Sequence, residues 1–188
     1  MIEKRDANVD AQADVGEEEH RRAEVVAADQ SHHLGSPRRL GASWEGDTML
    51  GASQAGPCVL SLVERKTGYL LLGQLRQRIS AAVNARARQL ITAQPHRVRT
   101  ITVDNGTEFH DYAALERATR TRFYFATPHH AWERGTNENT NGLVRQYLPK
   151  RQSMAHLTQD DCHRIAMKLN RRPRKRLGYR TPEECYAG

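Results

Sequence analysis

A short apolar run that ends in a turn constrains this chain most. Residues 100–106 read Thr-Ile-Thr-Val-Asp-Asn-Gly, so apolar side chains alternate with threonines and then meet an Asp-Asn-Gly turn signal. The alternation predicts a strand that contributes to a core, and the turn signal predicts where that strand ends. Asp104 is therefore expected at the tip of a core strand.

Further runs of the same kind predict four more strands, at residues 44–50, 58–64, 69–72 and 122–126. Near-helical spacing, helical propensity or N-cap signals predict helices at residues 78–92, 111–119, 137–147 and 158–169. The first three strands are expected to form an antiparallel meander that feeds a parallel crossover. This order indicates an α/β fold, in which helices flank a mixed sheet.

The 188 residues suffice for one well-buried core, but their charge is unevenly spread. Residues 139–188 hold 11 Lys or Arg against 4 Asp or Glu, and this excess equals the net charge of +7 of the whole chain. Residues 1–40 are acidic and contain no Phe, Tyr or Trp. We expect a disordered or poorly structured leader at 1–40, a core at 41–150 and a helical, basic C-terminal extension of the core at 151–188.

A basic segment beside an acidic pocket fits a polyanion better than a small substrate, because cations hold phosphates while acids hold the metal that acts on them. The alternative is an ordinary solvated basic face. The three cysteines show no Cys-x-x-Cys pairing, which argues against a disulfide framework or a zinc site. No stretch approaches the about 18 apolar residues of a membrane helix, so we expect a soluble, cytoplasmic chain with no membrane partner.

Three acids on separate predicted elements are the candidate metal ligands: Asp47, Asp104 and Glu138. A divalent ion such as Mg²⁺ takes oxygen ligands, and two such ions can activate the attacking oxygen and stabilise the leaving oxygen of a phosphodiester. That chemistry needs carboxylates that converge from different elements. Taken singly, each acid has an ordinary explanation, and an Asp before Asn-Gly often only caps a strand.

Longer motifs connect these acids. They are WEGDT at 44–48, LVERK at 62–66, TVDNGTEF at 102–109, the segment 132–150, LNRRPRK at 169–175 and TPE at 181–183. In these motifs the chain, over residues 43–187, resembles the IS-thirty family of bacterial insertion-sequence transposases of the DDE class. Between Asp104 and Glu138 lie 33 residues, which is like the family's spacing. The rival acids Glu108 and Glu133 match the motif less closely.

The resemblance implies a retroviral-integrase-like catalytic core of the ribonuclease H-like fold at residues 41–150. It implies that Asp47, Asp104 and Glu138 are the catalytic triad and hold two Mg²⁺ or Mn²⁺ ions. The implied activity is metal-dependent cleavage of DNA strands and their transfer to a target, as in DNA integration and recombination. The implied partners are element-end and target DNA and further copies of the chain assembled on that DNA, at the bacterial nucleoid.

Basic and amide side chains are the candidate DNA contacts. They are Arg134, Asn137, Asn141, Arg145, Lys150, Arg171, Arg172, Arg174, Lys175 and Arg176. The last five look like an arm that grips the phosphate backbone, a kind of contact that fixes register without identifying bases. Helix capping and surface solvation are the alternatives for Asn137 and Asn141.

Family members usually carry an N-terminal helix-turn-helix region, and residues 1–40 match nothing of that kind. We therefore expect a chain truncated at its N-terminus. Two rival hypotheses follow. The first is a non-catalytic transposase remnant that only binds DNA. The second is a metal-dependent nuclease that shares the site but does not join strands.

Overall fold

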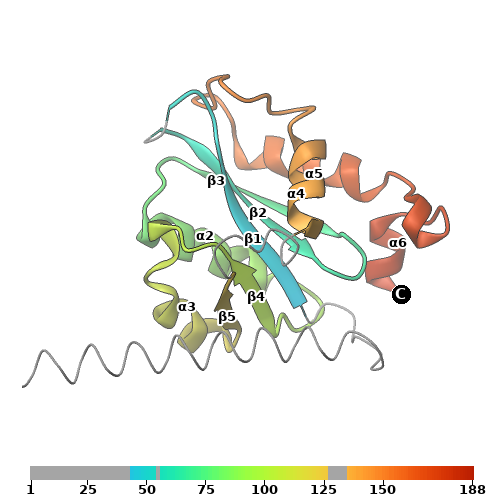
Figure 1. The fold of residues 1–188 in the computed structure, drawn as a ribbon, viewed down its shortest axis with the longest axis horizontal. Helices are drawn as coiled ribbons and strands as arrows, with labels where there is room; N and C mark the ends of the chain where they lie inside the picture. Colours follow the sequence, from blue (N-terminus) through green and yellow to red (C-terminus); the bar gives the residue numbers. More distant parts are fainter. Residues whose placement is uncertain (1–42, 54–55, 127–134) are drawn as a thin grey trace, which may run out of the picture.

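A five-stranded mixed sheet forms the centre of the computed structural model, which describes residues 43–53, 56–126 and 135–188 (Figure 1). The strand order is β3-β2-β1-β4-β5. The strands are β1 (Ser43–Leu50), β2 (Cys58–Glu64), β3 (Leu70–Leu75), β4 (Thr100–Val103) and β5 (Arg122–Phe125). The first three pair antiparallel, whereas β4 runs parallel to both β1 and β5. The predicted meander and parallel crossover are confirmed.

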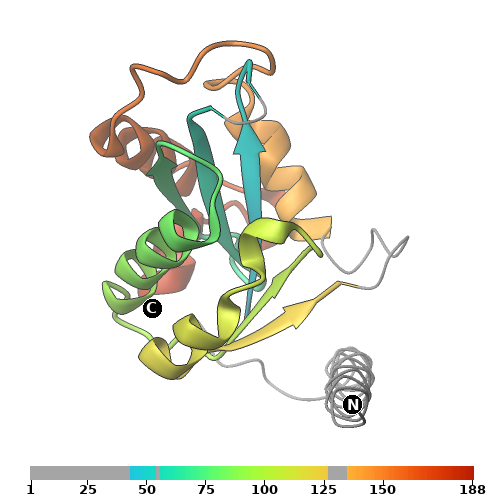
Figure 2. The same cartoon turned by 90° about the vertical axis from the view of Figure 1, so that its left-hand side faces the viewer.

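Helices cover both faces of the sheet (Figures 1 and 2). They are α2 (Ser80–Thr92), α3 (Tyr112–Thr119), α4 (Gly135–Val144), α5 (Gln159–Asn170) and α6 (Pro182–Ala187). Short 3-10 helices, η2 (Thr107–Phe109) and η4 (Lys175–Leu177), connect them. No helix among the described residues combines the length and the apolar character that crossing a membrane requires.

Strand β2 shows why the sheet needs a helix layer on each face. Its even-numbered residues Cys58, Leu60 and Leu62 pack into one core with residues of α2 and α3. Its odd-numbered residues Val59 and Val63 pack into a second core with residues of α4 and α5. Because successive side chains of a strand point to opposite faces, a strand buried on both sides reads as one continuous apolar run.

The C-terminal segment packs against the sheet through Tyr186 of α6, which is 3% exposed. The Tyr186 ring stacks on Tyr69 with centroids 4.2 Å apart and meets the edge of Trp44 at 5.8 Å. Burial raises the pKa of Tyr186 above its ordinary value. Helix α6 was not predicted from the sequence because it is only six residues long, although Thr181 and Glu184 form a capping box and Pro182 stands in its first turn.

The elements predicted from the sequence match the observed ones to within a few residues, and the mixed α/β fold is confirmed. Residues 171–176, predicted as a basic arm, follow α5, and the last two of them begin the 3-10 helix η4. The proposed leader at residues 1–40 lies outside the described residues. The division at 40 and 150 therefore stays a prediction.

Two tyrosines of the same segment test whether the C-terminal residues belong to the core. We expect Tyr186→Ala to lower the free energy of unfolding by about 3 kcal/mol, because it removes a buried aromatic side chain. Tyr179→Ala is the matched control, since Tyr179 is 71% exposed and its loss should cost less than about 0.5 kcal/mol. Urea unfolding followed by circular dichroism measures both values. Equal effects would contradict a core role for α6.

Candidate active site

Parallel pairing of β1 with β4 sets two of the predicted acids level with each other. Ser43 lies opposite Thr100 and Glu45 lies opposite Thr102, so the offset is constant. Continued for two residues, the same offset places Asp47 level with Asp104. The strands are still in close contact one step earlier, because a Cβ added at Gly46 would lie 3.0 Å from Val103 Cγ1. The register therefore sets Asp47 of β1 level with Asp104, the first residue after β4.

Helix α4 contacts Asp47 through the amide of Asn141 and contacts Ser61 of β2 through the amides of Asn137 and Asn141. Asn141 Nδ2 donates to Asp47 Oδ2 at 2.7 Å. The Ser61 hydroxyl donates to Asn141 Oδ1 at 3.0 Å and lies 3.3 Å from Asn137 Oδ1. Asn137 is completely buried (0% exposed), so its side chain packs on the sheet and not on the surface where a DNA contact was predicted. Residues four apart share a helix face, and here that face is polar.

Glu138, the third predicted acid, is an exposed residue of α4. It precedes Asn141 by three residues, and side chains three apart on a helix have Cβ atoms about 5–6 Å apart. Glu138 thus lies one helical turn from the amide that holds Asp47. Among the described residues, no group of three or more His, Cys, Asp or Glu side chains is arranged to hold a metal ion. The strand register thus sets the two aspartates level, and the helix that carries Glu138 contacts one of them, Asp47.

The donor chemistry of this site suits a hard divalent cation. Asp47 on β1 and Asp104 just after β4 offer carboxylate oxygens, and Mg²⁺ is usually bound by one or two carboxylates together with water and substrate phosphates. Asn141 occupies one oxygen of Asp47 and so fixes the orientation of that carboxylate. The residues present therefore fit a magnesium or manganese ion.

A tight turn follows Asp104. Asp104 Oδ1 accepts the Gly106 N–H at 3.2 Å, and a Cβ added at Gly106 would lie 3.0 Å from that oxygen and 2.5 Å from Glu108 Oε2. Glu108 is itself buried. Its Oε1 accepts from the Thr48 hydroxyl at 2.5 Å, and its Oε2 lies 3.2 Å from Arg78 Nη2. Glu108 thus ties the turn to β1 at the residue after Asp47.

Arg145, predicted as a DNA contact, lies within electrostatic reach of Asp47. Its Nη1 donates to the carbonyl of Leu50 at 2.9 Å and to that of Leu148 at 3.3 Å. Burial lowers the pKa of Arg145, and the negative charge of Asp47 opposes that shift. Arg145 therefore adds positive charge near the aspartates while it closes the end of α4. Arg134, Glu133 and Trp132 lie outside the described residues.

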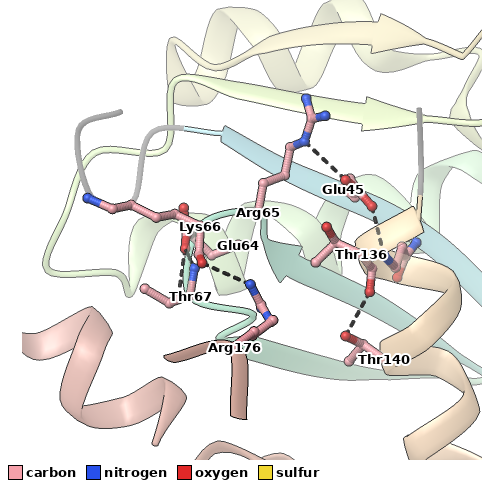
Figure 3. Close-up of polar contacts among 9 residues, drawn as sticks. Glu45, Glu64, Arg65, Lys66, Thr67, Thr136, Thr140 and Arg176 are labelled. Carbon is pink, nitrogen blue, oxygen red and sulfur yellow. Dashed lines mark hydrogen bonds and ion pairs between the residues drawn. The ribbon is translucent and has the colours of Figure 1, made fainter. Parts of the chain in front are cut away.

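Several predicted phosphate-binding arginines contact their own chain. Arg171 pairs with Glu183 at 2.9 Å, and Arg172 Nη1 lies 3.5 Å from Gln146 Oε1. Arg174 Nη2 donates to the Leu169 carbonyl at 3.3 Å, and burial lowers the pKa of Arg174. Arg176 Nη1 donates to the Lys66 carbonyl at 3.1 Å (Figure 3). Lys150 and Lys175 are exposed. The basic segment is thus folded onto the domain, and its fit to DNA stays a prediction.

Three curated relatives are transposases of insertion sequences. The chain is 38% identical over 157 residues to the transposase InsI for element IS30A of Escherichia coli (strain K12), which covers 83% of this chain and 40% of that protein. It is 40% identical over 140 residues to the transposase for element IS4351 of Bacteroides fragilis, which covers 74% and 43%. The transposase for element IS1086 of Cupriavidus metallidurans is 39% identical over 80% of this chain and 44% of its own length. The chain therefore spans about two fifths of the length of these relatives. No protein-family model matches it.

Solved structures share the fold at low sequence identity. The simian T-cell lymphotropic virus intasome in complex with the PP2A regulatory subunit B56 gamma matches with a TM-score of 0.65, 14% identity, and coverage of 83% of this chain and 58% of that chain. The catalytic core domain of BIV integrase matches with a TM-score of 0.58, 18% identity, and coverage of 78% and 94%. The ribonuclease H-like, integrase-type fold expected from the sequence is confirmed.

Two glycines test the turn after Asp104. We expect Gly106→Ala to lower the free energy of unfolding by about 1–3 kcal/mol, because the new Cβ would overlap the carboxylates of Asp104 and Glu108. Gly142→Ala, on α4, is the control, since a Cβ added at Gly142 would meet no atom within 4 Å. It should raise the free energy of unfolding by about 0.5–1 kcal/mol, because alanine favours helix. Urea unfolding gives both values, and a neutral Gly106→Ala would refute the crowded turn.

Proposed function

Since the chain belongs to the IS-thirty family of insertion-sequence transposases, we propose that it carries the DDE catalytic domain that cuts DNA strands and joins them to a target. The observation that supports this function is the register of β1 against β4, which, continued for two residues, sets Asp47 level with Asp104 just after β4, beside the helix α4 that contacts Asp47. The similarity to transposases and the integrase-type fold support the proposal that these carboxylates serve phosphodiester chemistry.

We assign the catalytic and metal-holding roles to Asp47, Asp104 and Glu138. Two Mg²⁺ or Mn²⁺ ions, when bound, would supply the positive charge that activates the attacking oxygen and stabilises the leaving oxygen. Asn141 orients the Asp47 carboxylate, and the turn at Gly106 orients that of Asp104. Glu138 would reach the same space from α4, one helical turn from Asn141.

The proposed reaction has two displacements at phosphorus. In the first, a water oxygen attacks, the bond to the 3′ oxygen breaks, and that oxygen leaves as a 3′ hydroxyl after it gains a proton. In the second, this hydroxyl attacks a phosphorus of the target strand, and the target's own 3′ oxygen leaves. Each displacement exchanges one P–O bond for another, so no external energy source is required.

The substrate we propose is DNA, at the element ends and at the target. Exposed Lys150 and Lys175, and the net charge of +7, favour contact with phosphates. We further propose that several copies of the chain assemble on the DNA, a proposal supported by the shared fold of the simian viral intasome. The relatives come from bacteria, so the proposed place of action is the bacterial cytoplasm, at the nucleoid.

Nicking of supercoiled plasmid tests this function. We expect the purified chain to nick DNA with Mn²⁺ or Mg²⁺ and to stop when EDTA is added. Asp47→Asn, Asp104→Asn and Glu138→Gln should each lower the rate at least about 100-fold, because each removes an interaction on which the transition state depends. Asp160→Asn is the control, since Asp160 is an exposed acid of α5. Full activity in Asp104→Asn would refute the assignment.

The products separate the rival activities. Joined products, in which one DNA is covalently linked to another, distinguish a transposase from a nuclease that only cuts. A wild-type protein that binds DNA in a mobility-shift assay but neither nicks nor joins it would favour the non-catalytic remnant.

A further inference from the structure

Glu45 is a fully buried acid beside the proposed site. It lies on β1 two residues before Asp47, so the two side chains share a face of the sheet. Glu45 is 1% exposed, and its Oε2 accepts the backbone N–H of Asn137 at 2.7 Å. Asn137 is the third residue of α4, and the first four N–H groups of a helix have no carbonyl partner within it. Glu45 therefore places a negative charge at the positive end of α4.

The second oxygen of Glu45 contacts a different element. Arg65, which directly follows β2, places its Nε 3.0 Å from Glu45 Oε1 (Figure 3). Arg65 is itself mostly buried, with 13% of its side chain exposed. The single carboxylate of Glu45 thus joins β1, the end of β2 and the start of α4. Hydrogen bonds to a charged group are shorter and stronger than those between neutral groups. The Glu45 carboxylate is also shielded from solvent.

Two contacts attach α4 to β1, and their spacings match. Glu45 holds Asn137, and Asp47 holds Asn141. Two residues of strand advance about 6.6 Å, and four residues of helix advance about 6.0 Å. The helix can therefore run alongside the strand with both contacts made. Glu138 lies between the two attachment points, so its position depends on both.

Apolar packing holds the other end of α4. The buried residues of this helix are Asn137, Thr140 and Val144, of which only Val144 is apolar, and Leu143 is partly buried beside it. The hydrophobic contacts thus lie in the last turn. In the first turn, where Glu138 lies, the described contacts to the sheet are polar. Loss of the Glu45 contact would therefore loosen the Glu138 end before the Val144 end.

We propose that Glu45, paired with Arg65, is a positioning residue that fixes the start of helix α4 and thereby holds Glu138 toward Asp47. This inference rests on the proposed function for its catalytic consequence, but the clamp itself is a property of the fold. Glu45 touches neither substrate nor metal in this proposal. It acts through the backbone of α4.

Glu64 provides a matched control for the test. It is also a buried glutamate at 1% exposure, at the end of β2. Its Oε2 accepts the N–H and the hydroxyl of Thr67, both at 2.6 Å, so it orders the turn after β2 (Figure 3). Glu64→Gln and Glu45→Gln therefore make the same chemical change at the same depth. They differ in whether the carboxylate holds α4.

Hydrogen exchange of the full chain, followed by mass spectrometry, measures the clamp directly. In Glu45→Gln we expect the amides of α4 to exchange at least about 10-fold faster than in the wild type, with Glu45→Ala faster still. In Glu64→Gln the rates in α4 should stay unchanged. If Glu45→Ala does not fold, Glu45→Gln decides alone, because its one amide oxygen cannot replace both carboxylate oxygens, so either the Asn137 N–H or the Arg65 Nε–H faces an NH2 group instead of an acceptor. Unchanged exchange in α4 of Glu45→Gln would overturn the proposal.

Plasmid nicking supplies the catalytic readout. We expect Glu45→Gln to lower kcat about 10–100-fold, which is the usual cost of losing a residue that orients a ligand or catalytic residue. We expect KM for DNA to change less than about 3-fold. Glu64→Gln should keep the wild-type kcat. Equal kcat values for the two variants would overturn the catalytic part of the inference. Suppose that the wild-type protein never nicks DNA, but that α4 still exchanges faster in Glu45→Gln. That result would reject the proposed function and would still support the clamp.

Discussion

The parallel pairing of β1 with β4 is the constraint on which the rest of this structure depends. It joins the antiparallel meander β1–β3 to the parallel part of the sheet, and its constant offset brings Asp47 level with Asp104. A slip of one residue would turn one strand over and send its side chains to the opposite face. The apolar residues Ile101 and Val103 prevent that slip, because they are fully buried in the core under α2 and α3. The core thus determines the position of the carboxylates.

The sequence predicted the strands around Asp47 and Asp104 well, because strands carry a clear signal. Alternation in residues 100–103 and the dense run at residues 58–64 gave strands with almost the observed ends. Asp104 follows directly from the turn signal. The resemblance to the IS-thirty family then selected Asp47 and Asp104 from the other acids. Their roles as ligands stay predictions, although their placement on neighbouring strands agrees with them.

Helix α4 was harder to predict, for a physical reason. A helix that packs on a sheet normally shows an apolar stripe, but the buried face of α4 begins with Asn137 and Thr140. An asparagine in a sequence usually indicates helix capping or surface solvation. The residues around Asn141 give no sign that Ser61 and Asp47 will lie opposite its side chain. The same limit applies to Arg174 and Arg176. Their charge suggested phosphate, whereas each donates to a carbonyl of its own chain.

Glu45 and Asp47 are similar residues to which their contacts assign different roles. They are acids on one face of one strand, and the sequence alone assigned a role only to the second. Glu45 meets the mostly buried Arg65 and the N-terminus of α4, so its charge is used within the fold. A buried ion pair of this kind adds little net stability compared with an apolar pair, because desolvation offsets the attraction. Its advantage is direction. Apolar contacts are non-directional, whereas a carboxylate with two defined donors fixes where α4 begins. A helix that carries a catalytic acid needs that definition more than it needs additional stability.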